Sequence, residues 1–375
     1  NFMIKNTMNL SEKKILFFSP VSHFKGGAEK CFMEFVENPF ISPEIAAPAD
    51  GPIFEAAKQK KIPTHIVPFG DVETVRRPFS FLKGMSVLRS LFQAAKILKK
   101  IAIDNDIKIV HSNGLKAHAI NCVSRAIGGP KAVVHIHDIP LTCQEKIIWK
   151  ILYLMCDKIL IVSRPCWPGG ELPPKCQVIH NGTILGKKIR IKSLGNNREI
   201  IFGFVGRIHP AKGLHLLLNW VAYAHKHGIK ARVSVRGSFS QEAPAYQSEI
   251  ETLINDLGLI DSVDFLGHIN NPDKVYEDLD IVVVPSQIPD PLPRSVMEPM
   301  AKGIPVFGYP AGGIPEMIEN GKSGFLVKNE KEFVQSLENL ANNYEQIVRG
   351  AQAKIQHEFT IERLYKDLNN VYYEL

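Results

Sequence analysis

The stretch IVVVPSQIPDPLPRSVMEPMAKGIPVFG, residues 281–308, decides the fold. An apolar, β-branched run predicts a strand over 280–285, and a second apolar run predicts a strand over 306–308. The small and apolar residues between them predict a helix over 297–303. Proline lacks a backbone N–H, so Pro299 allows this helix to begin only a few residues before it. The order strand, helix, strand predicts a parallel β-α-β unit.

The same alternation continues in both directions along the chain. In the second half the expected strands are 200–205, 231–236, 263–266, 281–285, 306–308 and 325–327, and the expected helices are 212–228, 243–258, 272–279 and 296–303. In the first half the expected strands are 14–18, 64–67, 107–111, 132–137, 158–162 and 177–179, with helices such as 29–36 and 79–101 between them. A charged stretch with Gly and Asn, residues 183–198, separates the halves as a linker. The pattern predicts two doubly wound parallel sheets.

Composition agrees with a soluble globular chain. The 375 residues are 45% hydrophobic and 22% charged, which is enough for two domains with adequate cores. The net charge of +7 favours anionic partners, whether nucleotide phosphates, nucleic acid or an anionic membrane, without choosing among them. No apolar run approaches the roughly 20 residues that span a bilayer, and no signal peptide is visible. We therefore expect a cytoplasmic protein.

The cysteines show no spacing that is typical of metal ligands. Free, buried thiols are the favoured interpretation for the six of them. A disulfide between Cys166 and Cys176 would close a loop, but nothing in the sequence requires it.

Two carboxylates, Asp290 and Glu298, lie eight residues apart between the strand and the helix of the opening stretch. The backbone amides of 291–297 would lie near a helix N-terminus, where they can donate to hydroxyls or phosphate. Glu298 could accept hydrogen bonds from a vicinal diol such as a ribose. The alternative is a capping Asp and a solvated Glu in the first turn.

Two cations stand in the segment VGRIHPAKG, residues 205–213, where a strand turns into a helix. Arg207 could bind a pyrophosphate as a bidentate fork and Lys212 as a point charge. The alternative is a pair of solvated surface cations.

Two further segments follow strands of the first half. Gly26 and Gly27 precede a helix, where glycine lets backbone N–H groups approach a phosphate, although a simple tight turn explains them equally well. His135 and His137 share one face of a strand end. A metal site would need a third ligand that no spacing supplies. A hydrogen-bonding role toward a sugar or phosphate is favoured for His137, and a structural role stays open for His135.

Taken together, these motifs resemble a known family. VGRIHPAKG, the D-x7-E segment, EPMAKGIPVFG and GGIPEMIENGKSGFLV are similar to the C-terminal half of retaining glycosyltransferases of family four, the glycosyl transferases group 1. The usual pattern there is E-x7-E followed by EAMAxGxPVV and GGxxEhhxxGxxGhLh. GGAEK, DKILIVS, VIHNGT and VDFLGHI also stand where that family has them. The resemblance is strong over 200–330 and looser before 190.

The resemblance implies an α/β chain with the GT-B fold, in which two Rossmann-like domains face each other across a deep cleft. Residues 1–185 would bind the acceptor, with a helix over 358–375 crossing back to them, and residues 186–357 would bind a nucleotide sugar. The implied reaction is transfer of a hexose-type sugar, with retention of configuration, to a glycan or lipid-linked acceptor in polysaccharide or glycolipid synthesis. A UDP-sugar is the favoured donor because UDP is common among relatives.

Roles of single residues follow from the same resemblance. Arg207 and Lys212 would hold the diphosphate and stabilise the leaving nucleotide, Glu298 would bind the ribose, Asp290 would contact the donor sugar, and His137 would lie near its reacting side. Further donor contacts would come from Gly26, Gly27, Gly206, Gly237, His268, Ile269, Pro291, Leu292, Ser295 and Val296. No metal is expected, so 104–106 and 278–280 are not interpreted as metal-binding DxD motifs.

Two positions depart from the family pattern. Asp290 replaces a Glu, which shortens the reach of the carboxylate by about 1.5 Å. Pro293 replaces a Gly and removes one backbone donor. Both changes bear on the donor sugar rather than on the reaction class. The alternatives are a GDP-sugar (mannose-type) transferase, a nucleotide-sugar epimerase or a phosphorylase. A nucleic-acid binder is least favoured, because basic patches interleaved with aromatic residues are not found.

The helix expected over 79–101 admits two interpretations. Its apolar residues at 81, 85, 88, 92 and 95 stand among Lys83, Arg89, Lys96, Lys99 and Lys100. This pattern resembles a basic amphipathic helix at a membrane interface. The favoured alternative is a helix that packs its apolar stripe on the sheet while its lysines are solvated. Peripheral contact with the inner membrane face is expected only if the acceptor is lipid-linked.

Overall fold

The computed structural model describes residues 13–23, 27–75, 84–186 and 198–375. The chain forms two compact units. The N-terminal unit runs to Gly182 and includes Ile361–Leu375, and the C-terminal unit is Thr183–Thr360. The sequence placed these boundaries at 185 and 358. The cleft expected between the two domains stays a prediction, and each unit is described by itself.

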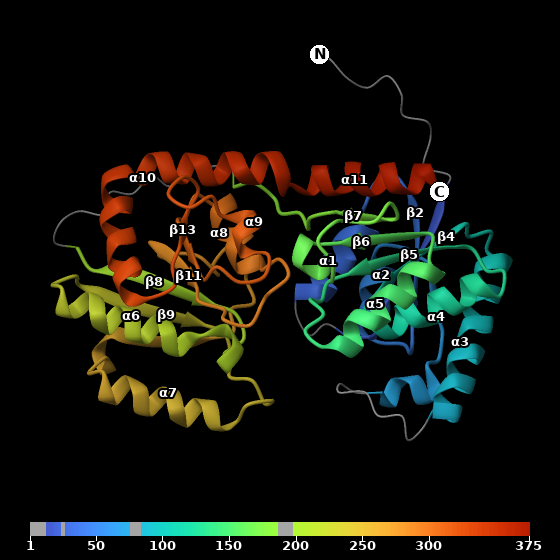
Figure 1. The fold of residues 1–375 in the computed structure, drawn as a ribbon, viewed down its shortest axis with the longest axis horizontal. Coiled ribbons are helices and arrows are strands. Elements are labelled where there is room, and N and C mark those ends of the chain that lie inside the picture. The colour runs from blue at the N-terminus through green and yellow to red at the C-terminus, as the bar shows by residue number, and fades with distance from the viewer. Residues whose placement is uncertain (1–12, 24–26, 76–83, 187–197) are drawn as a thin grey trace, which may run out of the picture. The chain divides into compact units, whose positions relative to one another are not determined.

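The N-terminal unit is built on a seven-stranded parallel sheet of order β3-β2-β1-β4-β5-β6-β7 (Figure 1). Its strands are β1 Lys14–Phe18, β2 Ser42–Ala47, β3 Thr64–Ile66, β4 Ile109–Asn113, β5 Lys131–Ile136, β6 Lys158–Ile161 and β7 Cys176–Val178. The strand order reverses between β1 and β4. In doubly wound sheets, ligands bind at the carboxyl ends of the strands at such a switch point.

One strand of this sheet, β2, was not expected. Its sequence SPEIAA lacks a β-branched or alternating pattern because Pro43 and Glu44 interrupt it. Tertiary contacts compensate for this. Glu44 is buried and its carboxylate lies 2.6 Å from the His65 ring on β3. A polar pair between neighbouring strands therefore replaces the apolar alternation that would have revealed the strand.

Helices cover both faces of this sheet. They are α1 Gly27–Val36, α2 Pro52–Gln59, α3 Gly84–Asp104, α4 Leu115–Ala126, α5 Cys143–Met155 and α11 Ile361–Glu374. Alternate residues of β1 point to opposite faces. Ile15 and Phe17 join the core under α1, α2 and α11, whereas Leu16 and Phe18 join the core under α3 and α4. The helix expected over 79–101 is thus α3, which extends to Asp104, and 79–83 lie outside the described residues.

The C-terminal unit has a six-stranded parallel sheet of order β10-β9-β8-β11-β12-β13. Its strands are β8 Ile200–Val205, β9 Ala231–Arg236, β10 Val263–Gly267, β11 Ile281–Val284, β12 Val306–Gly308 and β13 Phe325–Leu326. Its helices are α6 Leu214–Lys226, α7 Ala245–Asp256, α8 Arg294–Ala301, α9 Ile314–Met317 and α10 Glu330–Glu358. The strand order reverses between β8 and β11, so this is the second switch point.

The helix expected over 272–279 is wrong, since these residues form turns. The buried guanidinium of Arg236 explains the difference. Its Nη1 donates to the carbonyls of Lys274 and Val275 at 3.1 and 3.0 Å. Those carbonyls would otherwise accept helical hydrogen bonds. Asp278 then adopts a left-handed conformation with φ of 62°.

All six cysteines are free. Five are buried, as expected, and Cys143 at the start of α5 is exposed. Cys166 and Cys176 do not form a disulfide. Among the described residues, no helix is long and apolar enough to cross a membrane.

Candidate functional site

The carboxyl ends of β8 and β11 bring two loops of the C-terminal unit into direct contact. Gly213 has φ of +75°, and a Cβ added to it would lie 2.1 Å from the carbonyl oxygen of Pro285. Only glycine fits there, because any side chain would overlap the backbone that leaves β11. The loop with Arg207 and Lys212 therefore lies against the loop that leads to Asp290.

Lys212 and Asp290 form an ion pair between Nζ and Oδ2, although they are 78 residues apart. A turn fixes the backbone of Asp290. The N–H of Gly313 donates to the Asp290 carbonyl at 2.8 Å, and a Cβ on Gly312 would lie 2.2 Å from that oxygen. Lys212 and Asp290, which were both expected to contact the donor, therefore contact each other. Lys212 fixes the orientation of the Asp290 carboxylate, which is one methylene closer to the backbone than that of the usual Glu.

Arg207 lies five residues before Lys212 in the same loop and pairs with a different carboxylate. Its Nη1 donates to Glu242 Oε2 at 2.9 Å, and both side chains are more than half exposed. Exposed ion pairs contribute at most about 1 kcal/mol, so an incoming anion can replace Glu242 at little cost. The Arg207 loop begins close to the end of β9, since a Cβ on Gly237 would lie 1.8 Å from the Gly206 carbonyl oxygen.

Glu298 is held by two donors that the sequence analysis missed. The Tyr276 hydroxyl donates to Oε2 at 2.9 Å, and Arg294 Nε donates to Oε1 at 2.9 Å. Burial, together with the nearby Glu298 carboxylate, raises the pKa of Tyr276 well above its usual range, so the hydroxyl keeps its proton. The spacing i, i+4 could have revealed Arg294. Tyr276 gave no such signal, because its segment was expected to be a helix.

The other predicted donor contacts are spread along this edge of the sheet. Pro291 and Leu292 precede α8, and Ser295 and Val296 lie in its first turn. Val296 is fully buried and its N–H donates to the Pro293 carbonyl at 3.0 Å, so this residue packs in the core. His268 and Ile269 follow β10, which pairs with β9.

The N-terminal unit carries a cluster of histidines at the ends of β4 and β5, in which His111 and His135 are buried and His137 is half-buried. The Tyr372 hydroxyl of α11 lies 2.6 Å from His111 Nδ1, and His111 Nε2 lies 3.2 Å from His135 Nδ1. The rings of His135 and His137 are 4.5 Å apart, and Phe35 of α1 stacks on His135 at 4.8 Å. The two histidines therefore share a face, as the strand periodicity predicts.

Burial keeps these histidines neutral. It lowers the pKa of His137 to about 4, and burial together with the neighbouring His137 lowers the pKa of His111 to about 3. The pKa of His135 falls well below its usual range for the same two reasons. At neutral pH, His137 can donate or accept one hydrogen bond at Nε2 but carries no charge.

Several buried polar atoms at this edge of the sheet have no hydrogen-bond partner. In the described part of the chain, these atoms include His23 Nε2, Asn113 Oδ1, His137 Nε2 and Asn181 Oδ1. They belong to, or follow, the strands β1, β4, β5 and β7, whose carboxyl ends meet at one edge. A buried polar atom without a partner costs about 1–3 kcal/mol, so the set is suited to a hydroxylated ligand. Polar residues at the end of an apolar strand or within five residues after it were the signal that could have revealed His23, Asn113 and Asn181.

Gly27 is the exposed first residue of α1, and Gly26 lies outside the described residues. The two aspartate motifs have local partners. Arg198 and the Ile201 N–H bind the carboxylate of Asp280, and Lys108 binds Asp106. No group of three or more candidate metal ligands occurs in 13–23, 27–75, 84–186 or 198–375.

Part of the chain is also similar in sequence to known proteins. Residues 187–356 match the family model described as Glycosyl transferases group 1. Spore coat protein SA of Bacillus subtilis (strain 168) is 28% identical over 192 residues, which are 48% of this chain and 50% of that protein. The putative colanic acid biosynthesis glycosyltransferase WcaL of Escherichia coli (strain K12) is 27% identical over 191 residues, which are 48% of this chain and 45% of that protein. The chain spans about half the length of the curated relatives it matches.

Solved structures are similar in fold to this chain over nearly its whole length. The crystal structure of Anabaena HepE in complex with UDP has a TM-score of 0.77 at 21% identity, and the match covers 96% of this chain and 100% of that one. Further structures of HepE contain UDP and glucose, or UDP-glucose. Both sheets and their helices follow this architecture, which is the GT-B fold. Residues 187–356, which include Arg207, Lys212, Asp290 and Glu298, therefore match the Glycosyl transferases group 1 family model, in a chain with the GT-B fold.

Proposed function

We propose that this chain is a retaining glycosyltransferase of the cytoplasm. It moves a hexose-type sugar from a UDP-sugar to a glycan or lipid-linked acceptor in the assembly of a polysaccharide or glycolipid. The single observation that carries the proposal is the ion pair of Lys212 with Asp290 at the switch point of the C-terminal unit, within the residues that match the group 1 family model. This contact unites an anion-binding cation with a carboxylate suited to sugar hydroxyls.

The two cations act on the diphosphate of the donor. Arg207 exchanges Glu242 for a phosphate oxygen, and Lys212 reaches the diphosphate from beside Asp290. When the bond between the sugar and the diphosphate breaks, negative charge grows on the departing phosphate. Cations already in place stabilise that charge, an effect commonly worth 10²–10³-fold in rate for one preorganised group. With these two cations, the reaction is expected to need no metal.

Two carboxylates bind the two ends of the donor: Glu298 binds the ribose and Asp290 binds the sugar. Tyr276 and Arg294 each donate to one oxygen of Glu298 and fix the orientation of the carboxylate, which accepts from the hydroxyls of a ribose. Asp290 accepts from a hydroxyl of the sugar, while Lys212 fixes its orientation. Because Asp290 is short and Pro293 offers no N–H, the sugar must approach this loop more closely or carry a different hydroxyl pattern.

The acceptor binds the N-terminal unit. Its hydroxyls satisfy the unpartnered atoms of His23, Asn113, His137 and Asn181. His137 serves there as a neutral hydrogen-bond partner, because its pKa of about 4 leaves it uncharged at neutral pH. The UDP and UDP-glucose in HepE support a uridine nucleotide, and the biosynthetic role of WcaL supports a polysaccharide product.

A thermal-shift panel of UDP-, GDP- and ADP-sugars tests the donor. We expect the UDP-sugar to raise the melting temperature of the wild-type chain and of Lys230→Ala, an exposed control in the same unit. Arg207→Ala, Lys212→Ala and Glu298→Ala should each lose most of this shift and reduce transfer or donor hydrolysis by orders of magnitude. NMR of the product should show the anomeric configuration of the donor.

Other outcomes of this panel separate the alternatives. A shift by the GDP-sugar alone would replace the donor with a mannose-type sugar. Conversion of the nucleotide sugar to its epimer without transfer would identify an epimerase. Near-normal activity in all three alanine variants would overturn the site.

A further inference from the structure

His215 is the second residue of helix α6, and the proposed function gives it no role. It follows the loop that carries Arg207 and Lys212, and Lys212 lies three residues before it. Leu214 and Leu217 of the same helical turn are fully buried in the core of the C-terminal unit. His215 is half-buried instead, so its ring lies at the edge of that core, where it contacts neighbouring segments.

The ring of His215 is held by Tyr246 of helix α7. The Tyr246 hydroxyl lies 2.8 Å from His215 Nδ1 and accepts the His215 backbone N–H at 3.3 Å. The two rings are nearly perpendicular, at 86°. Burial raises the pKa of Tyr246, so the hydroxyl keeps its proton and can donate it to Nδ1. One hydroxyl therefore fixes both the backbone and the ring of His215.

His215 also forms a side-chain hydrogen bond with Gln287. Burial lowers the pKa of His215, although this hydrogen bond and the charge of Glu249 oppose the change, so the ring is neutral at neutral pH. A neutral imidazole carries one N–H. Since Nδ1 accepts from Tyr246, the proton lies on Nε2 and is donated to the side-chain carbonyl of Gln287.

Gln287 belongs to the segment that joins β11 to α8, and Asp290 follows three residues later in the same segment. Backbone contacts with two glycines fix Pro285, where the segment begins, and the carbonyl of Asp290. Between these two points Gln287 and Ile288 are exposed, and Ile288 is 50% accessible. Core packing therefore does not hold the middle of the segment, and the contact with His215 ties it to α6.

The contacts of Tyr246, His215 and Gln287 connect three loops at this edge of the sheet. Tyr246 follows the loop from β9 to α7, which carries Glu242, the partner of Arg207. Two backbone hydrogen bonds of 2.9 Å join that loop to the one with Arg207. His215 then joins both loops to the segment that leads to α8.

We propose that His215 is a positioning residue that sets how far the Asp290 carboxylate reaches toward the donor sugar. The inference rests on the proposed function and deepens it, because it names the part of the donor that is affected. Asp290 is one methylene shorter than Glu, so its reach depends on where its backbone lies. Lys212 fixes the Asp290 side chain, whereas His215 acts through Gln287 on the backbone that carries it.

Recognition of the nucleotide should not depend on His215. Glu298 is held by Tyr276 and Arg294, and Arg207 pairs with a carboxylate of another loop. Loss of His215 should therefore change recognition of the sugar and leave the affinity for free UDP as it is. A residue that only stabilised the fold would weaken both.

Kinetics of His215→Ala with UDP-glucose, UDP-galactose and UDP-N-acetylglucosamine test the proposal, with binding of free UDP measured by calorimetry. We expect kcat/KM for the preferred UDP-sugar to fall by about fivefold, which is the size of one lost hydrogen bond. The preference for that sugar over the next best should change by about threefold or more. The Kd for UDP should stay within about twofold of the wild-type value.

Conservative variants separate the two hydrogen bonds of the ring. The amide of glutamine reaches about as far as Nε2, whereas the amide of asparagine reaches only about as far as Nδ1. His215→Gln should therefore recover most of the wild-type sugar preference, and His215→Asn should behave like His215→Ala. Tyr246→Phe keeps the buried ring but removes the hydroxyl, so it should give a smaller loss of about twofold in the same direction.

A double-mutant cycle tests whether His215 acts through Gln287. Gln287→Ala should reproduce the change in sugar preference that His215→Ala causes. The double variant should be no worse than either single variant, because both remove the same contact. Multiplied losses in the double variant would show that His215 does not act through Gln287 and would overturn the proposal.

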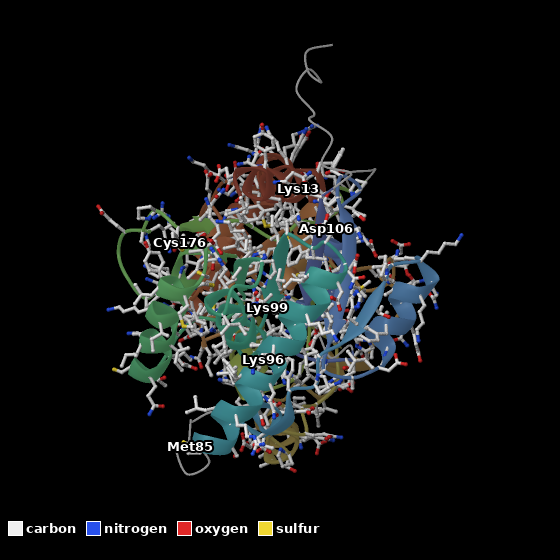
Figure 2. All side chains as sticks on the ribbon, turned by 90° about the vertical axis from the view of Figure 1, so that its right-hand side faces the viewer. Lys13, Met85, Lys96, Lys99, Asp106 and Cys176 are labelled. Atoms are coloured by element: carbon white, nitrogen blue, oxygen red, sulfur yellow. The ribbon has the colours of Figure 1, made fainter. Side chains whose placement is uncertain are left out.

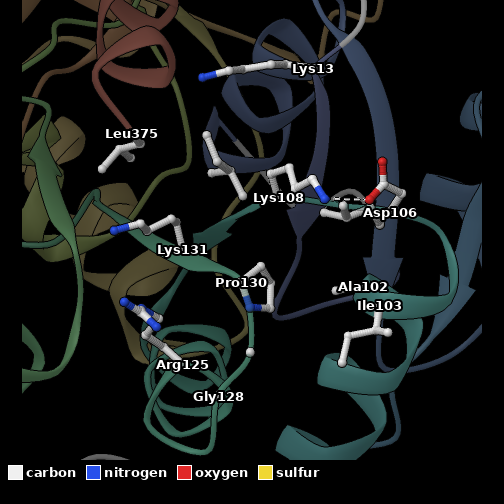
Figure 3. A pocket seen from close by; sticks show the side chains of 13 residues that line it. Lys13, Ala102, Ile103, Asp106, Lys108, Arg125, Gly128, Pro130, Lys131 and Leu375 are labelled. Atoms are coloured by element: carbon white, nitrogen blue, oxygen red, sulfur yellow. Dashed lines mark hydrogen bonds and ion pairs between the residues drawn. The ribbon is translucent and has the colours of Figure 1, made fainter.

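Three controls break single contacts elsewhere. His227 is exposed at the other end of α6, and its Nδ1 lies 2.9 Å from a backbone carbonyl oxygen one turn before it. In the N-terminal unit, Lys96 lies along α3 with its Nζ 4.6 Å from the centre of the Phe92 ring (Figure 2). Lys108 binds Asp106 beside a hollow of about 580 Å³ (Figure 3). His227→Ala, Lys96→Ala and Lys108→Ala should match the wild type in every measurement.

The outcomes distinguish this inference from the proposed function. An active wild type with unchanged kcat/KM and sugar preference in His215→Ala would overturn the inference alone. An equal loss of UDP affinity would do the same, since it would leave His215 a purely structural role. If His215→Ala does not fold, Gln287→Ala decides, because it changes an exposed residue. A wild type that converts none of the UDP-sugars would overturn the proposed function, and this inference with it.

Discussion

The two units share a doubly wound parallel sheet, yet the carboxyl edges of the two sheets differ in charge. In the C-terminal unit, charged side chains are paired in accessible positions, as Lys212 is with Asp290 and Arg207 with Glu242. In the N-terminal unit, the corresponding edge holds neutral, buried histidines and unpartnered polar atoms. The first edge is suited to a diphosphate and the second to hydroxyl groups. The shared fold therefore leaves the chemistry to a few residues at the strand ends.

The outer helices differ in the same way. Helix α7 of the C-terminal unit carries Glu249, Glu251 and Asp256, and none of its described residues is a large exposed apolar side chain. Helices α3 and α5 carry lysines among exposed apolar residues. One architecture thus carries carboxylates on an outer helix of one unit and lysines among exposed apolar side chains on outer helices of the other.

The largest expected effect concerns the close contact at the switch point of the C-terminal unit. Gly213→Ala should lower the free energy of unfolding by roughly 3 kcal/mol, because it combines a left-handed backbone with an overlap at the Pro285 carbonyl. Denaturant unfolding of the chain measures this loss, and donor binding should weaken with it.

Gly228→Ala is the matched control for that prediction. Gly228 has φ of +77°, but a Cβ there meets no atom within 4 Å. Gly228→Ala should lower the free energy of unfolding by about 1–2 kcal/mol, because only the left-handed backbone conformation disfavours alanine there. Equal losses in the two variants would show that the contact between the β8 and β11 loops does not decide the geometry of this edge.

The next effect concerns the hydrogen bond from α11 to the histidine cluster. Tyr372→Phe keeps the ring but leaves His111 Nδ1 buried without its partner. We expect a loss of about 1–3 kcal/mol in unfolding free energy. Tyr223→Phe, at a half-buried residue of the other unit, should change stability by less than about 0.5 kcal/mol. A neutral result for Tyr372→Phe would mean that the histidine cluster does not depend on α11.

The last prediction concerns a pH dependence that should distinguish the two units. The pKa of His111 and of His137 is lower in the folded state than the usual 6.5, so the unfolded chain binds more protons between the two values. Stability should therefore fall as pH drops below about 6.5, by up to about 1.4 kcal/mol per pH unit for each histidine. Above pH 6.5 these groups contribute no pH dependence.

Hydrogen exchange of the two sheets at pH 7 and pH 5 measures this difference. Amides of β4 and β5 should lose protection at pH 5, while those of β8 and β11 serve as an internal control. His137→Gln should reduce the loss. Equal loss of protection in both sheets would contradict the assignment of the pH dependence to the histidine cluster.

Local pattern predicted most of the fold because hydrophobic periodicity is a property of neighbouring residues. The strands β1, β8 and β9 lie where the alternation placed them. The failures occurred where distant residues decide the conformation. Glu44 of β2 depends on His65, and the turn at 272–279 depends on Arg236. Neither partner is visible from the segment itself.

The candidate site divides in the same way. The sequence indicated Arg207, Lys212, Asp290 and Glu298 through residue type and spacing. It did not indicate Tyr276, which lies 22 residues before Glu298 and donates to it. It also did not indicate that Tyr372 contacts His111 across 261 residues. Contacts of this kind can be identified only when it is known which strands and helices lie side by side.

The sequence by itself determined the alternation of strands and helices, the basic charge and the identity of the charged site residues. These follow from local hydrophobicity and from motifs of fewer than ten residues. Tertiary structure alone decided that Lys212 meets Asp290, that the histidines are buried and neutral, and that α3 and α5 expose apolar side chains. These properties depend on strand order and on which helix face the sheet covers. Both are set by contacts between residues far apart in the chain, so no local pattern contains them.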